Sequence, residues 1–178
     1  IRHARYTSLF FDLGSYLEKK YRTLFSERWK VVSKSDIDRY LFHEFILELC
    51  TACHEGNVSD RRKKLDELLS MQELWSDRQI QMIYREFCKV INWIKDIFPK
   101  DSIKFTRFRN KSDFYSLFVV LLKLVKDGYV TTDGKSNKIA GKFLMSFSKE
   151  IKELNSKIDI KKREINKLSD IEEKLKPY

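Results

Sequence analysis

Glycine and proline are scarce in this sequence, with five glycines and two prolines among 178 residues. Sandwiches and barrels need many turns, and turns are built largely from these residues, so their scarcity argues against an all-β fold. Hydrophobic residues make up 42% of the chain and charged residues 35%, a balance that argues against disorder. We therefore expect one all-α domain with an apolar core and charged surfaces.

Cysteine and histidine are also few, with three of each. The stretch "CTACH" places Cys50, Cys53 and His54 in the C-x-x-C-H spacing of c-type haem attachment. Haem attachment requires export, for which the sequence shows no signal, and a spacing of three puts both thiols on one helical face, where core cysteines are common. Zinc is disfavoured because Cys88 stands apart and no second ligand pair accompanies it. We expect no cofactor or metal in this chain.

The motifs of common enzyme classes are missing. The sequence has no G-x-x-x-x-G-K-[ST] loop, no G-x-S-x-G elbow and no H-E-x-x-H helix. Asp36 and Asp38 read as acids at a helix start rather than as a catalytic pair. The sequence thus predicts no catalytic residues, and this chain alone is expected not to be an enzyme.

Long hydrophobic runs are missing too. The longest, near residues 114–122, stops at Lys123, well short of the roughly 18 residues that a membrane span needs. The start is too charged and its apolar stretch too short for a signal peptide. We expect a cytoplasmic protein with no membrane partner, and the initial Ile1 suggests a piece of a longer polypeptide.

Helical periodicity is present almost throughout. Apolar residues at helical spacing predict helices over 8–29, 36–54, 59–71, 77–98 and 112–127. Ser35, Ser76 with Gln79, and Ser112 are the expected caps, and Gly56, Pro99 and Gly128 the expected stops. Residues 114–125 are apolar on nearly every side, so helix 113–127 is expected to be the buried centre. The prediction is an orthogonal or irregular bundle of about six helices, counting a long terminal helix, with residues 1–136 as the bundle.

Residues 137–178 form the last predicted element, a long amphipathic helix after the turn "TTDGKSN". Eight of ten positions in an a/d heptad reading from 144 to 175 are apolar, with Lys161 and Glu172 the exceptions. Such a helix either lies on the bundle or forms a coiled-coil seam for a second copy or a partner. The expected interaction residues are Leu144, Phe147, Ile151, Leu154, Ile158, Ile165 and Leu168.

Positive charge exceeds negative charge, with a formal net charge of +10, so nucleic acid is a plausible partner. The excess is concentrated at the two ends of the chain and in residues 100–138, whereas residues 31–99 are slightly acidic. In "KFTRFRNK" at 104–111, basic and aromatic residues alternate without an acid. Either the cations contact phosphates while Phe105 and Phe108 anchor the loop or stack on bases, or both rings enter the core and the charges stay hydrated. The candidate nucleic-acid-binding residues are Lys104, Arg107, Arg109, Lys111, Arg61, Arg62, Lys63 and Lys64.

Four segments in order are similar to the helical second half of GmrSD-type domains from modification-dependent restriction nucleases. They are "IRHARYTSLFFDLGSYLEKKY", "SDIDRYLFHEFILEL", "DRRKKLDELL" and "RFRNKSDFYSLFVVLLKL", together spanning about residues 1–128. The family's lysine-rich helix and its basic loop leading into "[KR]-[ST]-x-F-Y-x-L-F" both have counterparts here.

The resemblance implies a nucleotide-dependent restriction protein that acts against phage DNA with modified bases. The family's D-G-Q-Q-R motif for nucleotide hydrolysis and the histidine metal site of its nuclease half have no counterpart in this sequence. The chain would then be a helical, DNA-engaging module without the catalytic parts, while the parent protein would use a nucleoside triphosphate and a divalent metal. The alternative is a protein-interaction module that works through the terminal heptads, dimerising or binding other domains of its parent.

Overall fold

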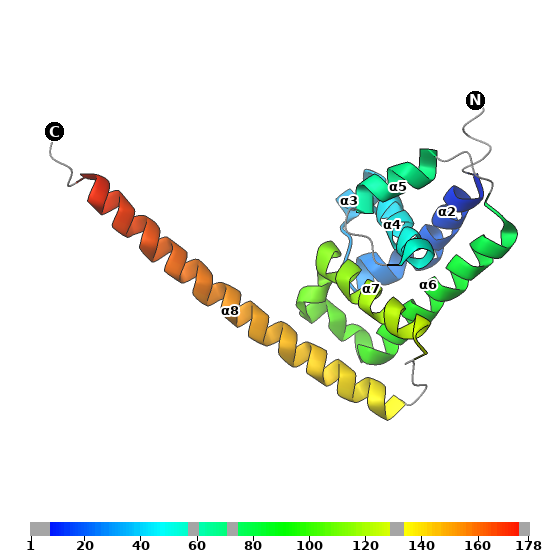
Figure 1. Cartoon of the computed structure of the whole chain (residues 1–178). Helices are drawn as coiled ribbons and strands as arrows, with labels where there is room; N and C mark the ends of the chain where they lie inside the picture. The colour runs from blue at the N-terminus through cyan, green and yellow to red at the C-terminus, as the bar shows by residue number, and fades with distance from the viewer. Residues whose placement is uncertain (1–7, 57–60, 71–74, 129–133, 175–178) are drawn as a thin grey trace.

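The computed structural model describes residues 8–56, 61–70, 75–128 and 134–174, and within these ranges the chain is helical with no strand (Figure 1). The predicted all-α class is confirmed. The elements in order are α2 (Ser8–Thr23), η1 (Leu24–Arg28), α3 (Lys34–Asp38), α4 (Leu41–Glu55), α5 (Arg61–Ser70), α6 (Asp77–Ile97), η2 (Pro99–Phe105), η3 (Arg107–Arg109), α7 (Lys111–Lys126) and α8 (Gly134–Lys174).

Helix ends follow local capping chemistry, although two caps differ from the prediction. Ser76 and Gln79 form the predicted capping box of α6. Ser33, not Ser35, caps α3, and its hydroxyl and amide both bond the Asp36 carboxylate. Asn110 rather than Ser112 is the N-cap residue of α7, and its side chain makes no capping bond. Both errors arise because two residues that can cap a helix stand two positions apart near each expected start, Ser33 and Ser35 in one case and Asn110 and Ser112 in the other.

Tyr40 divides the single helix predicted over 36–54 into α3 and α4. Its backbone is left-handed, with φ of 58°, a conformation that non-glycine residues adopt rarely. The ring is 80% exposed. Two helices that meet at an angle replace one straight helix because the α-helical hydrogen-bond pattern cannot pass through this residue.

The core is centred on α4 and is rich in aromatic rings. Phe25 contacts the rings of Trp29, Phe42, Phe45 and Phe114 at centroid distances from 5.1 to 6.4 Å. Helix α4 packs on α2, α3, α5, α6 and α7, so most of its faces are covered. The predicted central helix, α7, buries one face against α6 and α4 but leaves Val120 58% exposed.

Helix α8 starts within the stretch predicted to be a turn and leaves the bundle after its first half (Figure 1). Its first half packs on α6 and η3. Trp93 Nε1 donates to Asn137 Oδ1 at 2.8 Å, and Gly141 lies so close to α6 that a Cβ there would be 2.0 Å from the Ile97 carbonyl oxygen. Glycine is therefore required at this crossing.

Candidate nucleic-acid interface

The basic loop, residues 104–111, is held rigidly by two buried side chains, Ile103 and Phe108. Pro99 ends α6, and two short 3-10 segments follow because the chain must turn from α6 into α7 within a few residues. Thr106 stabilises the second segment, since its hydroxyl donates to the Ile103 carbonyl and accepts from the Phe108 amide. The loop is therefore part of the folded core and not a freely hydrated connection.

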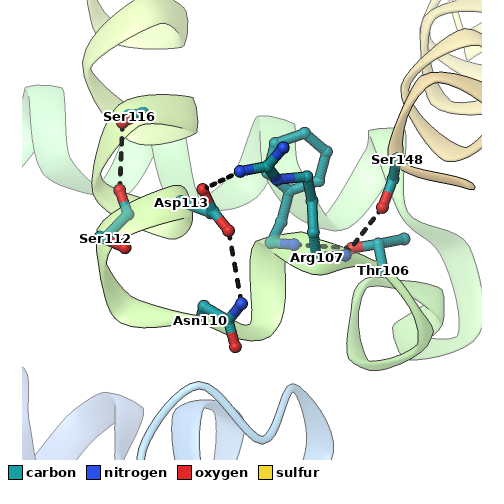
Figure 2. Close-up of polar contacts among 8 residues, drawn as sticks. Thr106, Arg107, Asn110, Ser112, Asp113, Ser116 and Ser148 are labelled. Carbon is teal, nitrogen blue, oxygen red and sulfur yellow. Dashed lines mark hydrogen bonds and ion pairs between the residues drawn. The ribbon is translucent and has the colours of Figure 1, made fainter. Parts of the chain in front are cut away.

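The side chain of Arg107 points to Asp113 in the first turn of α7 and anchors the loop there (Figure 2). One guanidinium nitrogen donates to Asp113 Oδ1 at 2.7 Å, and this bond raises the pKa of Arg107. The backbone N–H of Arg107 donates to Ser148 Oγ on α8 at 2.7 Å. Arg107 thus fastens α7, η3 and α8 to one another, with its charge already paired.

The two phenylalanines of the basic loop have opposite environments. Phe108 is buried beside Phe98, at a centroid distance of 6.0 Å. Phe105 is 81% exposed, and the Lys104 ammonium lies 5.1 Å from its ring centre. Phe108 therefore enters the core, whereas Phe105 is displayed to solvent.

A cleft of about 410 Å³ separates the basic loop from α8, and we call it the basic cleft. Within the described part of the chain, no carboxylate pairs with Lys104, Arg109 or Lys152, and the acid in the lining, Asp113, is paired with Arg107. The lining is formed by Lys104, Phe105, Thr106, Arg107, Arg109, Asn110, Asp113, Ile151, Lys152 and Asn155. The cleft therefore presents an excess of positive charge beside an exposed ring.

Lys152 and Asn155 were not among the predicted site residues. They enter the basic cleft because Ser148, one turn earlier, fastens α8 to the loop. The heptad pattern predicted Ile151 as an interaction residue. Lys152 and Asn155 follow it by one and four positions and therefore lie beside the same face of the helix. Only the docking of α8 shows that this flank faces the basic loop.

Lys111 is directed away from the cleft. Its ammonium bonds the Asp36 carboxylate on α3. Burial alone would raise the pKa of Asp36, but this bond and those from Ser33 outweigh burial and lower the pKa to about 2. Lys111 therefore joins α7 to α3, and its predicted phosphate contact stays a prediction.

The predicted lysine-rich cluster on α5 is remote from the basic cleft. Helix α5 packs on α4 and lies in Figure 1 at the end of the bundle away from α8. Lys64 Nζ is 3.5 Å from Glu55 Oε1 and 3.4 Å from Glu67 Oε2, and Lys63 is exposed. The side chains of Arg61 and Arg62 lie outside the described residues. The structure thus does not unite the two basic stretches.

The predicted interaction residues of α8 divide into two groups. Leu144 packs on the core and Ile151 is half-buried in the cleft wall. Phe147, Leu154 and Ile158 are exposed. The side chains of Ile165 and Leu168 lie outside the described residues. Leu144 and Ile151, seven positions apart, therefore dock α8 on the bundle, whereas Ile158, the next position of the same heptad row, is exposed together with Phe147 and Leu154.

Cys50 and Cys53 lie fully inside the core, and burial raises the pKa of both thiols. His54 packs edge-on against Trp75, with ring centroids 4.9 Å apart. Neither thiol can reach a haem edge without unfolding α4. The described residues contain no group of His, Cys, Asp or Glu able to hold a metal, and none of the described helices combines the length and apolar character for a bilayer crossing.

No family model, curated protein or solved structure matches this chain. The similarity to GmrSD-type domains therefore stays a prediction drawn from the sequence motifs. The geometry of the basic cleft is the main ground for a functional proposal.

Proposed function

We propose that the chain is a DNA-engaging module, and that the basic cleft binds a strand containing unpaired bases. The observation that carries the proposal is Phe105, an exposed ring beside cations that have no carboxylate partner among the residues the structure describes. A cationic groove with an aromatic ring is the usual arrangement in proteins that bind single strands without sequence preference.

Lys104, Arg109 and Lys152 supply the phosphate contacts in this proposal. They converge from η2, η3 and α8 on one cleft, so a strand lying along it meets three cations within a short path. Each contact releases a condensed counterion, which makes binding sensitive to salt. Arg107 does not contribute to the salt dependence of binding, because Asp113 already neutralises its charge. It positions the loop instead.

Phe105 supplies the contact to a base. A base stacked on an aromatic side chain contributes about 1–3 kcal/mol. Bases inside an intact duplex are stacked on one another, so the ring can be used fully only by a single strand, a flipped base or a junction. The cleft is accordingly expected to prefer DNA with unpaired bases over a plain duplex.

The wider role follows from the sequence resemblance. We place this DNA-engaging module in a modification-dependent restriction protein that defends against phage. Nucleotide hydrolysis and DNA cleavage, with the nucleoside triphosphate and divalent metal that they require, belong to other parts of the parent protein. The isolated chain is then expected to bind DNA without cutting it.

Fluorescence anisotropy across a salt series tests the proposal, using a labelled 12-nucleotide single strand and its duplex. The triple variant Lys104→Gln/Arg109→Gln/Lys152→Gln should make the single-strand salt slope shallower by about two units. Phe105→Ala should weaken single-strand binding by about five- to a hundredfold and leave the slope unchanged. Its effect on the duplex should be much smaller.

Two control variants separate these effects from bulk charge and hydrophobicity. Lys161→Gln/Lys162→Gln removes exposed charge on the far half of α8, and Phe143→Ala removes a ring that is also strongly exposed. Both should bind as wild type. Equal losses in the control variants, or a Phe105→Ala protein with unchanged single-strand affinity, would contradict the proposal.

Self-association through α8 is the second candidate function, and the exposed apolar residues Phe147, Leu154 and Ile158 favour it. In a coiled coil these residues would insert between those of a second helix. Sedimentation velocity should then show a dimer that Ile158→Asp dissociates and Ser156→Asp, a neighbouring exposed position, does not. A monomer at high protein concentration would rule out this function.

A further inference from the structure

A second and larger cleft, of about 670 Å³, lies between α2 and α6, and we call it the α2–α6 cleft. All of its charged lining residues are cations. The lining comprises Lys20, Tyr21, Thr23, Leu24, Arg28, Tyr84, Arg85, Cys88, Lys89, Asn92 and Lys95. No aspartate or glutamate is among these residues, although the charge of the whole segment 31–99 is slightly acidic.

The lining comes largely from one stripe on each helix. On α6, Arg85, Lys89 and Asn92 follow one another at helical spacing, and on α2 and η1, Lys20, Leu24 and Arg28 do the same, so each stripe carries two cations. Within the described residues, no carboxylate pairs with Arg85, Lys89 or Lys95, whereas Arg28 bonds Asp101 Oδ2 at 2.9 Å. Like charges that face each other across a cleft destabilise a fold unless a counter-charge joins them.

Lys20 is fixed in position by tyrosines rather than by an acid. Its ammonium donates to the Tyr84 hydroxyl at 2.7 Å and lies 4.9 to 5.7 Å from the ring centres of Tyr16, Tyr21 and Tyr84. The bond to Tyr84 raises the pKa of Lys20. The Lys20 ammonium therefore stays charged, and it is already held in one position before a ligand binds.

The chemistry of the lining selects the class of ligand. Ammonium and guanidinium groups are donors only, and Asn92 and Thr23 add polar groups at the wall. An amine or a metal cation would meet no acid here. An anion with several oxygens could bond groups from both helices, and the volume lies within the range of small-molecule sites.

We propose that the α2–α6 cleft is a binding site for consecutive phosphate groups, separate from the basic cleft. Two sources share this chemistry, a free polyphosphate chain such as that of a nucleotide and the backbone of a nucleic-acid strand. The site does not depend on the basic cleft, because none of its lining residues is shared with it.

Isothermal titration calorimetry with inorganic tripolyphosphate tests the proposal, with sulfate at equal ionic strength as the comparison anion. Arg85→Gln/Lys89→Gln should weaken tripolyphosphate binding by about ten- to a hundredfold. The basic-cleft triple variant Lys104→Gln/Arg109→Gln/Lys152→Gln and the control Lys161→Gln/Lys162→Gln should bind it as wild type does. An equal loss in these two proteins would show diffuse charge attraction and overturn the proposal.

A second arm uses the 12-nucleotide single strand. If tripolyphosphate binds and the strand is unaffected by Arg85→Gln/Lys89→Gln, the source is a free polyphosphate. If that variant weakens strand binding as well as tripolyphosphate binding, the source is a nucleic-acid backbone. Absence of both effects overturns the proposal.

Thermal unfolding without any ligand gives an independent readout of the same idea. Since Arg85 and Lys89 lie in a cleft without a counter-charge, their replacement by glutamine should leave the protein as stable as wild type or more stable. A lower melting temperature of that variant would show a structural role for these cations and would overturn the proposal. Tripolyphosphate should raise the melting temperature of wild type and not that of the variant.

Discussion

Gly141→Ala is expected to destabilise the protein, although alanine is the better helix former. In an exposed helix the change would add about 1 kcal/mol of stability. Here the new Cβ would lie 2.0 Å from the Ile97 carbonyl oxygen, whereas ordinary contacts begin at 3.4 Å. Backbone lies on both sides of this contact, so α8 has to move away from α6.

The magnitude follows from what that movement breaks. The bonds from Trp93 to Asn137 and from the Arg107 amide to Ser148 both cross this interface, and each contributes about 1 kcal/mol. Steric overpacking costs a further 1–3 kcal/mol or so. After the gain in helix propensity is subtracted, the free energy that docks α8 should fall by about 2–4 kcal/mol.

Hydrogen exchange of the Arg107 amide is the most direct assay, because that amide is protected by Ser148 on α8. Gly141→Ala should speed its exchange, and DNA binding should lose the Lys152 contribution, about one unit of salt slope. Lys142→Ala at the neighbouring exposed position is the control and should change stability by no more than about 0.5 kcal/mol. A Gly141→Ala protein that is more stable than wild type and keeps the Arg107 amide protected would refute the reasoning.

Two further predictions concern titratable groups. The pKa of Asp36 is lowered from 3.8 to about 2, so its bond to Lys111 stabilises the fold above pH 4 and this contribution disappears as pH falls towards 2. Wild type should exceed Asp36→Asn in urea stability by about 0.5–1 kcal/mol at pH 6, since the pair is partly exposed, and the gap should vanish near pH 2. A gap that persists there would contradict the ion-pair account. Brief iodoacetamide labelling at pH 8, read by mass spectrometry, should modify half-buried Cys88 before the buried Cys50 and Cys53, while unfolded protein should label evenly. Equal labelling in the folded protein would mean that the core face of α4 opens readily.

Local patterns were sufficient to predict the helices and several of their ends. The box of Ser76 with Gln79 and the stops at Gly56 and Pro99 depend on residues within one turn. The break at Tyr40 was missed because a left-handed backbone at a tyrosine leaves no mark in hydrophobic periodicity. Leu9 and Tyr16 lie at helical spacing with the buried Leu13 and are nevertheless exposed, while Phe10 is buried, because the rotation of a helix about its axis depends on what packs beside it.

For the candidate site, the sequence pointed to the basic loop but not to its form. Four cations without an acid were visible at 104–111. The partners of these cations were not visible, because they lie far away along the chain. Asp36, which bonds Lys111, is 75 positions from it, and Ser148, which accepts from the Arg107 amide, is 41 positions from Arg107. The α2–α6 cleft gave no sequence signal, since its two stripes are each unremarkable on an amphipathic helix.

By itself, the sequence determined the all-α class, the positions of most helices, the long amphipathic terminal segment and the excess of positive charge, because these depend on composition and on spacings within a few turns. The tertiary structure decided which cations are neutralised and which remain available, which phenylalanine is displayed, and which helix faces meet to form a cleft. Those properties depend on contacts between residues far apart in the chain, and packing geometry fixes them only when the whole fold is assembled.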